Sequence, residues 1–279
     1  TATFTADGTW SSIDTGDVAQ GGDDTISIAG GNNVVLGGTG SDTITTGGGE
    51  DLVFGDHGRV DYTDGILTSA ESTDHGAGGD DVIEAGEGNN TVFGGFGSDS
   101  LTTGTGADIL VGDNGKVVFA SGTQTGGIAT WISSTDSDDT TGSDDVIVAG
   151  DGANRVIGGA GSDTITTGAG DSTILGDHGR LTYTDTGVLT EAVSILEDQG
   201  AADTITSGDG DNLIIAGQGG DNVTVGTGSN IVLGDGGTAT FTADGTWSSI
   251  DTGDVAQGGD DTISIAGGNN VVLGGTGSD

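Results

Sequence analysis

The chain contains no cysteine, no proline and no methionine, and only 4 of its 279 residues are lysine or arginine. The absence of cysteine excludes a disulfide framework. Because phosphate binding depends on lysine and arginine, we expect no nucleic-acid partner for a chain with so few basic residues. No apolar run reaches the roughly 18 residues that a membrane-spanning helix requires, so we also expect no membrane span.

Acidic residues and glycine are abundant instead. The chain has 44 Asp and Glu residues, 61 glycines and a formal net charge of −40. Such a charge is typical of disordered acidic chains. Here, however, Val, Ile and Thr recur at a fixed interval, which indicates an ordered repeat. Because self-repulsion opposes compaction, we expect a cation to neutralise the charge when the chain folds.

The sequence repeats itself on a large scale. Residues 1–42 recur without a single change as residues 238–279, which is typical of a long tandem array. The repeats predict an insertion hairpin of a preceding module at 1–18 and the start of the next repeat at 258–279. Between them we predict four modules, each with its own insertion, at 19–75, 76–139, 140–197 and 198–257.

Each module contains four consecutive nonapeptides. In the first module these rows are AQGGDDTIS, IAGGNNVVL, GGTGSDTIT and TGGGEDLVF. Nearly every row has Gly at its fourth position, Asp or Asn at its sixth (once Ser172) and an aliphatic residue at its eighth. Nine residues divide into about six for a turn and three for a short strand, so two rows form one flattened coil with the eighth-position residues between two parallel sheets. The pattern predicts an all-β solenoid whose stability depends on stacked neighbours.

The rows resemble the G-G-x-G-x-D-x-U-x nonapeptide of RTX (repeats-in-toxin) calcium-binding proteins. The resemblance covers most of the chain outside the four insertions, and sixteen near-matches in tandem make it specific. It implies a parallel β-roll in which Ca²⁺ lies between turns one coil apart, bound by sixth-position carboxylates and glycine carbonyls. The chemistry of the residues agrees, since oxygen ligands on flexible glycine turns suit Ca²⁺ better than Zn²⁺ or Mg²⁺.

The two edges of the predicted roll differ in charge. Turns that enter rows one and three share one edge, where the sixth position is always aspartate. We predict calcium ligands there at Asp24, Asp42, Asp81, Asp99, Asp145, Asp163, Asp203, Asp221, Asp261 and Asp279.

The opposite edge has about half that charge or less. Row two always has asparagine there, at Asn33, Asn90, Asn154, Asn212 and Asn270, and row four varies among Asp51, Asp108, Ser172 and Asn230. Two alternatives stay open for this edge. It is either weakly metallated, with Asp51 and Asp108 as calcium ligands in modules one and two, or it is a ladder of side-chain amides.

Strands of rows two and four are apolar on both faces, as in VVL at 34–36 and LVF at 52–54. Such strands are buried on both faces, so something must cover their outer side. Each insertion contains two stretches of alternating apolar and polar residues on either side of a turn such as TDG, which predicts a β-hairpin. An enlarged coil of the solenoid is the alternative. We expect the hairpins to cover this sheet through Val60, Tyr62, Phe119, Trp131 and Tyr183. In the other alternative, neighbouring chains cover it.

Few residues suggest other chemistry. His57 and His178 occupy equivalent turn positions where other modules have Asn114 and Gly236, which favours a role in turn conformation, and His75 has no counterpart. Arg59, Lys116 and Arg180 follow the same turn, and we expect them to pair with Asp56, Asp113 and Asp177. Trp10, Trp131 and Trp247 are expected to pack within the hairpins. No nucleophile elbow, zinc spacing or phosphate loop is present, so the sequence predicts a non-enzyme.

These observations together predict an extracellular, calcium-dependent structural array. We expect a stiff solenoid that forms the stalk of a surface adhesin or a self-associating matrix filament, with tandem copies of itself and a cell-surface or matrix ligand as partners. The RTX resemblance implies a bacterial protein exported by type I secretion. The alternative is a calcium-dependent secretion and folding module of a secreted RTX enzyme or toxin, which the unchanged repeat of 42 residues disfavours.

Overall fold

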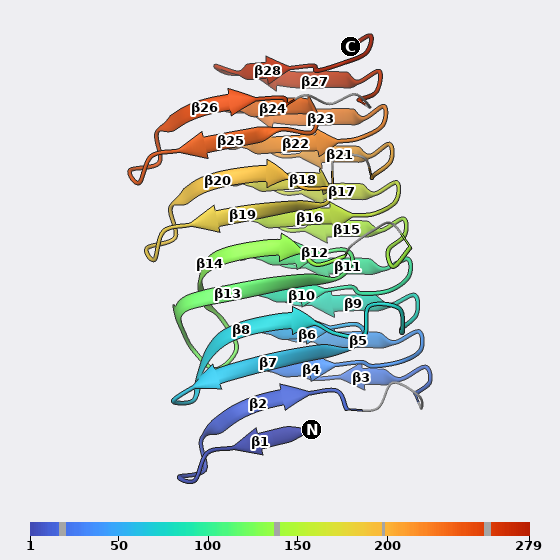
Figure 1. Ribbon diagram of the computed structural model, residues 1–279, viewed down its shortest axis with the longest axis vertical. Coiled ribbons are helices and arrows are strands. Elements are labelled where there is room, and N and C mark those ends of the chain that lie inside the picture. Colours follow the sequence, from blue (N-terminus) through green and yellow to red (C-terminus); the bar gives the residue numbers. More distant parts are fainter. Residues whose placement is uncertain (17–20, 137–139, 197–198, 254–257) are drawn as a thin grey trace.

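The computed structural model describes residues 1–16, 21–136, 140–196, 199–253 and 258–279, and these form β-strands and turns with no helix among them. The predicted module boundaries after residues 18, 139, 197 and 257 lie outside this part of the chain. The strands build three sheets that run side by side along one long axis (Figure 1). The two termini lie at opposite ends of this axis.

The open sheet is parallel and contains the strands of rows one and three. Its outer face is exposed, and its middle residues point to the core. Its nine strands, in spatial order, are β27 (Thr262–Gly267), β23 (Asn222–Thr227), β21 (Thr204–Ser207), β17 (Thr164–Thr167), β15 (Val146–Ala149), β11 (Ser100–Thr103), β9 (Val82–Ala85), β5 (Thr43–Thr46) and β3 (Thr25–Ser27).

The middle sheet is also parallel and contains the strands of rows two and four. Most of its residues are buried on both faces, as their composition predicts. Its nine strands are β28 (Val271–Leu273), β24 (Ile231–Asp235), β22 (Leu213–Gly217), β18 (Thr173–Asp177), β16 (Arg155–Gly159), β12 (Ile109–Val111), β10 (Thr91–Phe93), β6 (Leu52–Phe54) and β4 (Val34–Leu36).

The hairpin sheet is antiparallel and contains the insertions, which are hairpins rather than enlarged coils. In the first complete hairpin, Asp64 and Gly65 both have positive φ, as a two-residue hairpin turn requires. The ten strands are β1 (Ala2–Phe4), β2 (Trp10–Asp14), β7 (Gly58–Thr63), β8 (Ile66–Ser72), β13 (Gly115–Gly122), β14 (Gly127–Ser134), β19 (Gly179–Tyr183), β20 (Leu189–Ser194), β25 (Thr238–Phe241) and β26 (Trp247–Asp251).

The first hydrophobic core lies between the open and middle sheets. The eighth-position residues stack in register, so that Ile44 pairs with Ile83 in one sheet and Val53 with Val92 in the other. All four of these side chains are fully buried. This arrangement confirms the predicted parallel β-solenoid.

The second hydrophobic core lies between the middle sheet and the hairpin sheet. Val60, Tyr62, Phe119 and Tyr183 pack there, as predicted, against residues such as Phe54. The hairpins therefore cover the apolar sheet, and neighbouring chains are not needed for this.

The prediction for Trp131 was wrong. Trp131 lies opposite Val118 in the regular register of the hairpin, and both side chains are only partly buried. The register shifts beyond this pair, so that Ala129 lies opposite Phe119. Ala129 and Ile132 face the core in its place.

Glycine is required where successive turns touch. Gly40 has φ +114°, and a methyl group on it would lie 2.6 Å from the carbonyl carbon of Gly22 in the neighbouring coil. An L-residue would therefore be strained in its backbone and would push the coils apart. The coil spacing of about 4.8 Å thus depends on these turn glycines.

The packing of the hairpin sheet on the middle sheet can be tested at Phe93. This side chain is fully buried and its ring stacks on Phe54 with 4.6 Å between centroids. Phe93→Ala in calcium-saturated protein should lower the free energy of unfolding by about 3–5 kcal/mol, because it leaves a cavity in the second core. Urea denaturation measures this.

The matched control for Phe93 is Thr204→Ala, on the exposed face of the open sheet. This change should alter the free energy of unfolding by less than about 1 kcal/mol. Equal losses for the two variants would contradict a buried middle sheet.

Candidate metal centre

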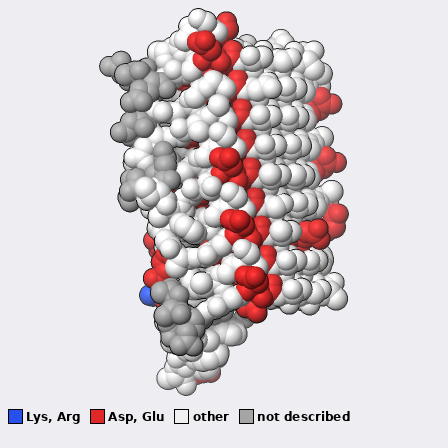
Figure 2. All heavy atoms as spheres, turned by 90° about the vertical axis from the view of Figure 1, so that its right-hand side faces the viewer, with Lys and Arg blue, Asp and Glu red and all other residues white. Residues whose placement is uncertain are grey.

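The aspartate edge is the column of turns that enter rows one and three, and the ten predicted aspartates line it. The backbone N–H of each aspartate donates to the Oδ1 atom of the next, as from Asp42 to Asp81 at 2.7 Å and from Asp81 to Asp99 at 2.8 Å. The same hydrogen bond continues from Asp24 at one end to Asp279 at the other. Acidic side chains form a column along this side of the molecule (Figure 2).

The second carboxylate oxygen of these aspartates has no partner. The Oδ2 atoms are buried without a hydrogen bond in Asp42, Asp81, Asp99, Asp145, Asp163, Asp203, Asp221 and Asp261. None of these residues is more than 4% exposed. A buried charged oxygen without a partner is costly, so its repetition along one edge indicates a ligand that binds there.

Glycine leaves a gap in front of seven of these eight oxygens, whereas Ala216 stands at the equivalent place before Asp221. A methyl group on Gly55 would lie 2.1 Å from Asp81 Oδ2 and 2.6 Å from the carbonyl oxygen of Gly94. One coil further on, a methyl on Gly94 would lie 2.4 Å from Asp99 Oδ2. A carboxylate oxygen and a carbonyl oxygen thus face the same gap, and both are ligands that Ca²⁺ prefers.

Among the described residues, no group of three or more acidic and histidine side chains converges closely enough to hold a metal by itself. The ligand set that fits is therefore mixed, with aspartate carboxylates and glycine carbonyls. When bound, Ca²⁺ would neutralise the column of carboxylates. The assignment of individual aspartates as ligands stays a prediction.

Burial changes the titration of the aspartate edge. Desolvation raises the pKa of Asp81 to about 7 and that of Asp221 to about 8. It also raises the pKa of Asp99, Asp145 and Asp163 well above the usual range, and neighbouring carboxylates add to the effect. At neutral pH the folded edge therefore needs either a cation or protons.

The asparagine edge is the opposite column of turns, and its row-two turns are closed by amides. Asn90 Nδ2 donates to the carbonyl oxygens of Gly86 at 2.9 Å and Gly88 at 3.2 Å. Asn212 makes the same contacts with Gly208 and Gly210. The amide N–H₂ group thus donates to turn carbonyls that a cation would otherwise attract. This observation favours the amide ladder for the row-two turns.

Asp51 and Asp108 interrupt the asparagine edge with charge. Their Oδ1 atoms accept the backbone N–H groups of Asn33 and Asn90. Their Oδ2 atoms are fully buried and have no partner, and burial raises the pKa of Asp108 to about 6. These two positions resemble the aspartate edge, so metal binding there stays a prediction.

The expected pairing of basic residues with the turn aspartates was wrong. Arg59 pairs with Asp61 at 2.8 Å, Lys116 with Glu71 and Arg180 with Glu191, also at 2.8 Å. All of these partners lie on the hairpin sheet. Asp56, Asp113 and Asp177, together with Asp235, lie at the aspartate edge instead. The shared G-D turn identifies these four aspartates in the sequence. Their side chains contact turns of the roll, however, and not the basic residues that follow them.

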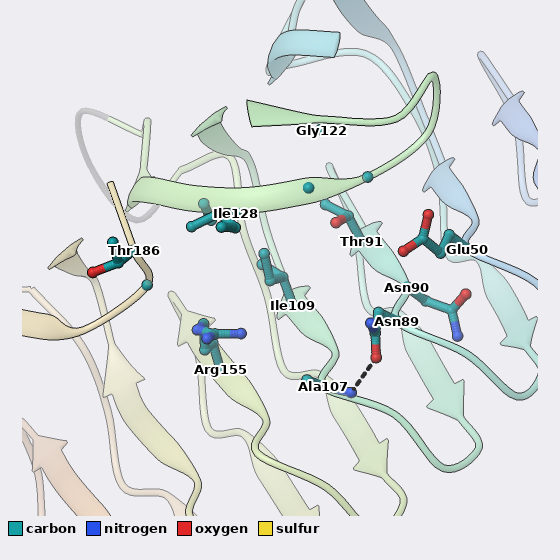
Figure 3. Close-up of a pocket in the computed structure, with 14 residues that line it drawn as sticks. Glu50, Asn89, Asn90, Thr91, Ala107, Ile109, Gly122, Ile128, Arg155 and Thr186 are labelled. Atoms are coloured by element: carbon teal, nitrogen blue, oxygen red, sulfur yellow. Dashed lines mark hydrogen bonds between the residues drawn. The ribbon is translucent and has the colours of Figure 1, made fainter. Parts of the chain in front are cut away.

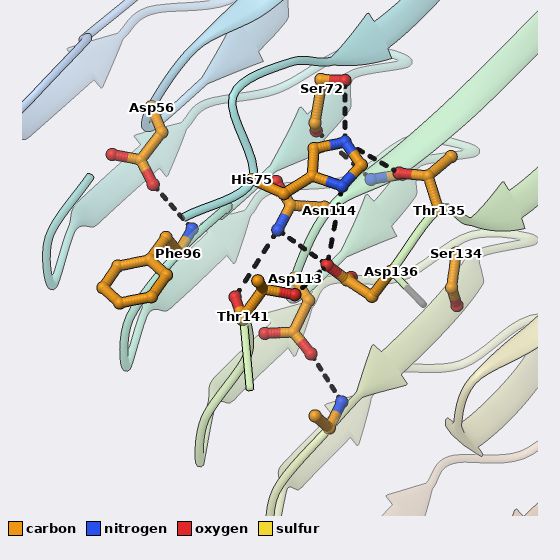
Figure 4. Close-up of polar contacts among 12 residues, drawn as sticks. Asp56, Ser72, His75, Phe96, Asp113, Asn114, Ser134, Thr135, Asp136 and Thr141 are labelled. Carbon is orange, nitrogen blue, oxygen red and sulfur yellow. Dashed lines mark hydrogen bonds and ion pairs between the residues drawn. The ribbon is translucent and has the colours of Figure 1, made fainter. Parts of the chain in front are cut away.

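His57 and His75 contact residues of neighbouring turns and hairpins. His57 is buried, and its Nε2 lies 2.9 Å from Thr39 Oγ1, in keeping with a role in the turn. His75 Nε2 lies 3.1 Å from the carbonyl oxygen of Ser72, and its Nδ1 lies 3.8 Å from Asp136 (Figure 4). Asn114 donates to the same Asp136 oxygen at 3.0 Å. These contacts connect the end of one hairpin, at His75, to the end of the next, at Asp136, and Asn114 joins Asp136 to the start of that second hairpin.

A cavity of about 590 Å³ lies between the β13–β14 hairpin and the asparagine edge (Figure 3). Its lining includes Glu50, Asn89, Ile128, Arg155 and Thr186. No histidine lies among its lining residues, and Arg155 is held over the ring of Tyr183 at 4.9 Å. The cavity therefore offers no pairing of a nucleophile with a histidine base.

Comparison with known families agrees with this geometry. The family model described as the RTX calcium-binding nonapeptide repeat matches the chain in four copies, at residues 28–59, 75–110, 139–174 and 198–232. No curated protein and no solved structure matches the chain. The four matches confirm the resemblance drawn from the nonapeptides and the assignment of calcium as the cofactor.

The raised pKa values predict an unusual pH dependence for metal-free protein. The folded-state pKa reaches about 7 for Asp81 and about 9 for Asp56, above the value of about 3.9 in an unfolded chain. Stability from protonation is therefore fully present below about pH 4 and is lost as the pH rises through the folded-state values. Far-UV circular dichroism in EDTA should show β-structure appearing on acidification. A metal-free chain that is more ordered at neutral than at acid pH would contradict this.

The amide closure of the asparagine edge can be tested with Asn90→Asp. The change replaces a donor to two glycine carbonyls with a second acceptor, so each lost hydrogen bond should cost about 1 kcal/mol at low calcium. High calcium should restore part of the loss by filling the new carboxylate site. Urea denaturation at the two calcium levels measures the difference.

The control for Asn90 is its exposed neighbour, Asn89→Asp. The Oδ1 atom of Asn89 accepts the backbone N–H of Ala107 at 2.8 Å, and aspartate keeps that acceptor. The control should show little loss at either calcium level. If both variants behave alike, the amide does not replace a cation.

Proposed function

Because the chain belongs to the RTX calcium-binding nonapeptide repeat family, we propose that it is an extracellular structural array that stiffens when calcium binds. It forms the stalk of a surface adhesin or a self-associating matrix filament. The observation that carries this proposal is the unbroken column of buried, unpartnered aspartate oxygens along a continuous three-sheet rod. Such a rod is rigid only where its edge charge is neutralised.

Tandem copies support the array. Trp10 packs near Tyr62 of the following hairpin, with 6.3 Å between ring centroids. Trp247 occupies the same place in the identical segment and is 55% exposed. A hairpin is therefore completed by the hairpin that follows it, which is how neighbouring units stabilise repeat proteins.

The calcium affinity expected for these sites means that the array folds outside the cell. Extracellular calcium modules typically bind with dissociation constants of about 10⁻⁴ to 10⁻³ M. Such sites stay empty in cytosol, so the chain would be exported unfolded and would become rigid outside the cell. Members of the RTX family are typically secreted by bacteria, and we propose type I secretion for this chain. The role is structural rather than catalytic, which the family match to a calcium-binding repeat supports.

The proposal is tested by removing calcium. Far-UV circular dichroism should show β-structure in calcium and its loss in excess EDTA at neutral pH, with Mg²⁺ at equal ionic strength unable to restore it. Chains extended by a further 1–237 unit should form rods longer by about 38 Å at constant width, since each unit adds eight strand spacings. Small-angle X-ray scattering measures length and width. An EDTA spectrum identical to the calcium spectrum would refute the proposal.

A further inference from the structure

Four aspartates lie where the chain leaves the roll to form each hairpin. These turn aspartates, Asp56, Asp113, Asp177 and Asp235, follow a glycine in the G-D turn, and none is more than 4% exposed. Their neighbouring basic residues pair with other acids on the hairpin sheet. The turn aspartates therefore need another source of positive charge.

Each turn aspartate joins the place where the chain leaves the roll to the place where it returns. Asp56 Oδ1 accepts the N–H of Gly79 at 3.2 Å, and its Oδ2 accepts the N–H of Phe96 at 2.6 Å (Figure 4). Gly79 lies in the turn that enters row one of the next module, and Phe96 lies in the turn that enters row three. Equivalent pairs of N–H groups donate to Asp113, Asp177 and Asp235.

The sixth-position aspartates of those same two turns add negative charge near Asp56. The charges of Asp81 and Asp99 both act on its carboxyl group. Asp81 Oδ2 is buried, has no partner and faces the gap at Gly55, the residue next to Asp56. The carbonyl oxygen of Gly94 faces that gap as well. Asp81 Oδ2 and the carbonyl oxygen of Gly94 thus face one gap beside Asp56.

The same set recurs at the other three junctions. Asp145 Oδ2, Asp203 Oδ2 and Asp261 Oδ2 are unpartnered and face Gly112, Gly176 and Gly234, the glycines of the other G-D turns. The four pairs are Asp56 with Asp81, Asp113 with Asp145, Asp177 with Asp203, and Asp235 with Asp261.

The fold reserves room for these carboxylates. A methyl group on Gly78 would lie 2.0 Å from Asp56 Oδ2, and one on Gly95 would lie 2.5 Å from it. Glycine at both positions lets the backbone close around the carboxylate and keeps its charge out of solvent. A carboxylate enclosed in this way beside two others is destabilising unless a cation is present.

We propose that each turn aspartate supplies a second carboxylate to a calcium site that it shares with the row-one aspartate of the next module. This inference rests on the proposed calcium-dependent function and assigns residues outside the nonapeptide to it. Calcium at these four junction sites fastens the hairpin sheet to the roll. The extra charge makes the junction sites bind Ca²⁺ more tightly than the turns without a turn aspartate.

The test compares two fourfold variants. The first changes Asp56, Asp113, Asp177 and Asp235 to Asn. The control changes Asp23, Asp80, Asp144 and Asp260 to Asn. The control residues are exposed, lie on the same edge and remove the same charge, and each accepts one N–H from a serine.

Calcium titrations followed by circular dichroism give the calcium concentration at half-folding. This midpoint should rise about tenfold or more in the turn variant, because each junction site loses one of its two carboxylate charges. It should change less than about threefold in the control, whose carboxylates are exposed to solvent. Native mass spectrometry at limiting calcium should show four fewer bound ions in the turn variant only.

The outcomes separate this inference from the proposed function. Equal shifts in both variants, with wild-type folding still dependent on calcium, would overturn the junction sites alone. Wild-type protein that is folded in EDTA at neutral pH would overturn the proposed function. If the fourfold turn variant does not fold at any calcium concentration, Asp56→Asn alone decides. One fewer tightly bound calcium supports the inference, and an unchanged count refutes it.

Discussion

The structure depends on burying a column of like charges at one edge of a thin solenoid. Successive turns place a carboxylate directly above another, and each uses one oxygen to accept the N–H of its neighbour. The other oxygen is left without a donor. Because the same turns also supply glycine carbonyls, neutralisation by Ca²⁺ converts the main obstacle to stacking into its principal support.

The two edges close the same kind of turn by different chemistry. On the aspartate edge the turn needs an external cation. On the asparagine edge the side-chain amide of residues such as Asn90 donates to the turn carbonyls itself. We therefore expect the aspartate edge to carry most of the calcium dependence, while the row-two turns of the other edge are held by hydrogen bonds that the chain provides. We expect each coil to need less calcium than it would with aspartates on both edges, while folding still depends on calcium.

The hairpin sheet gives the thin solenoid a second core. Rows two and four are apolar on both faces, and the hairpins bury the face that the open sheet does not. Since each hairpin leaves and re-enters the roll at the aspartate edge, its attachment lies beside the same carboxylates. Cation binding and burial of the second core are therefore physically linked.

Much of this arrangement followed from the sequence alone, because a nine-residue period assigns every position to a turn, a core or a face. The inward Ile44 and the aspartate column are local consequences of that period, and the hairpin turn at Asp64 follows from the local TDG sequence of the insertion. The partners of Asp56 and the side of Trp131 were not predictable. Asp56 meets Gly79 and Phe96, which are distant in sequence and near only after coils stack. Trp131 faces outward because its neighbour Ile132 pairs with Val117 and faces the core, and the register of this hairpin is set by strand pairing. The sequence thus determined the repeating coil and its charged edge, whereas tertiary stacking decided which carboxylates and backbone N–H groups lie together, because those contacts run between coils rather than along them.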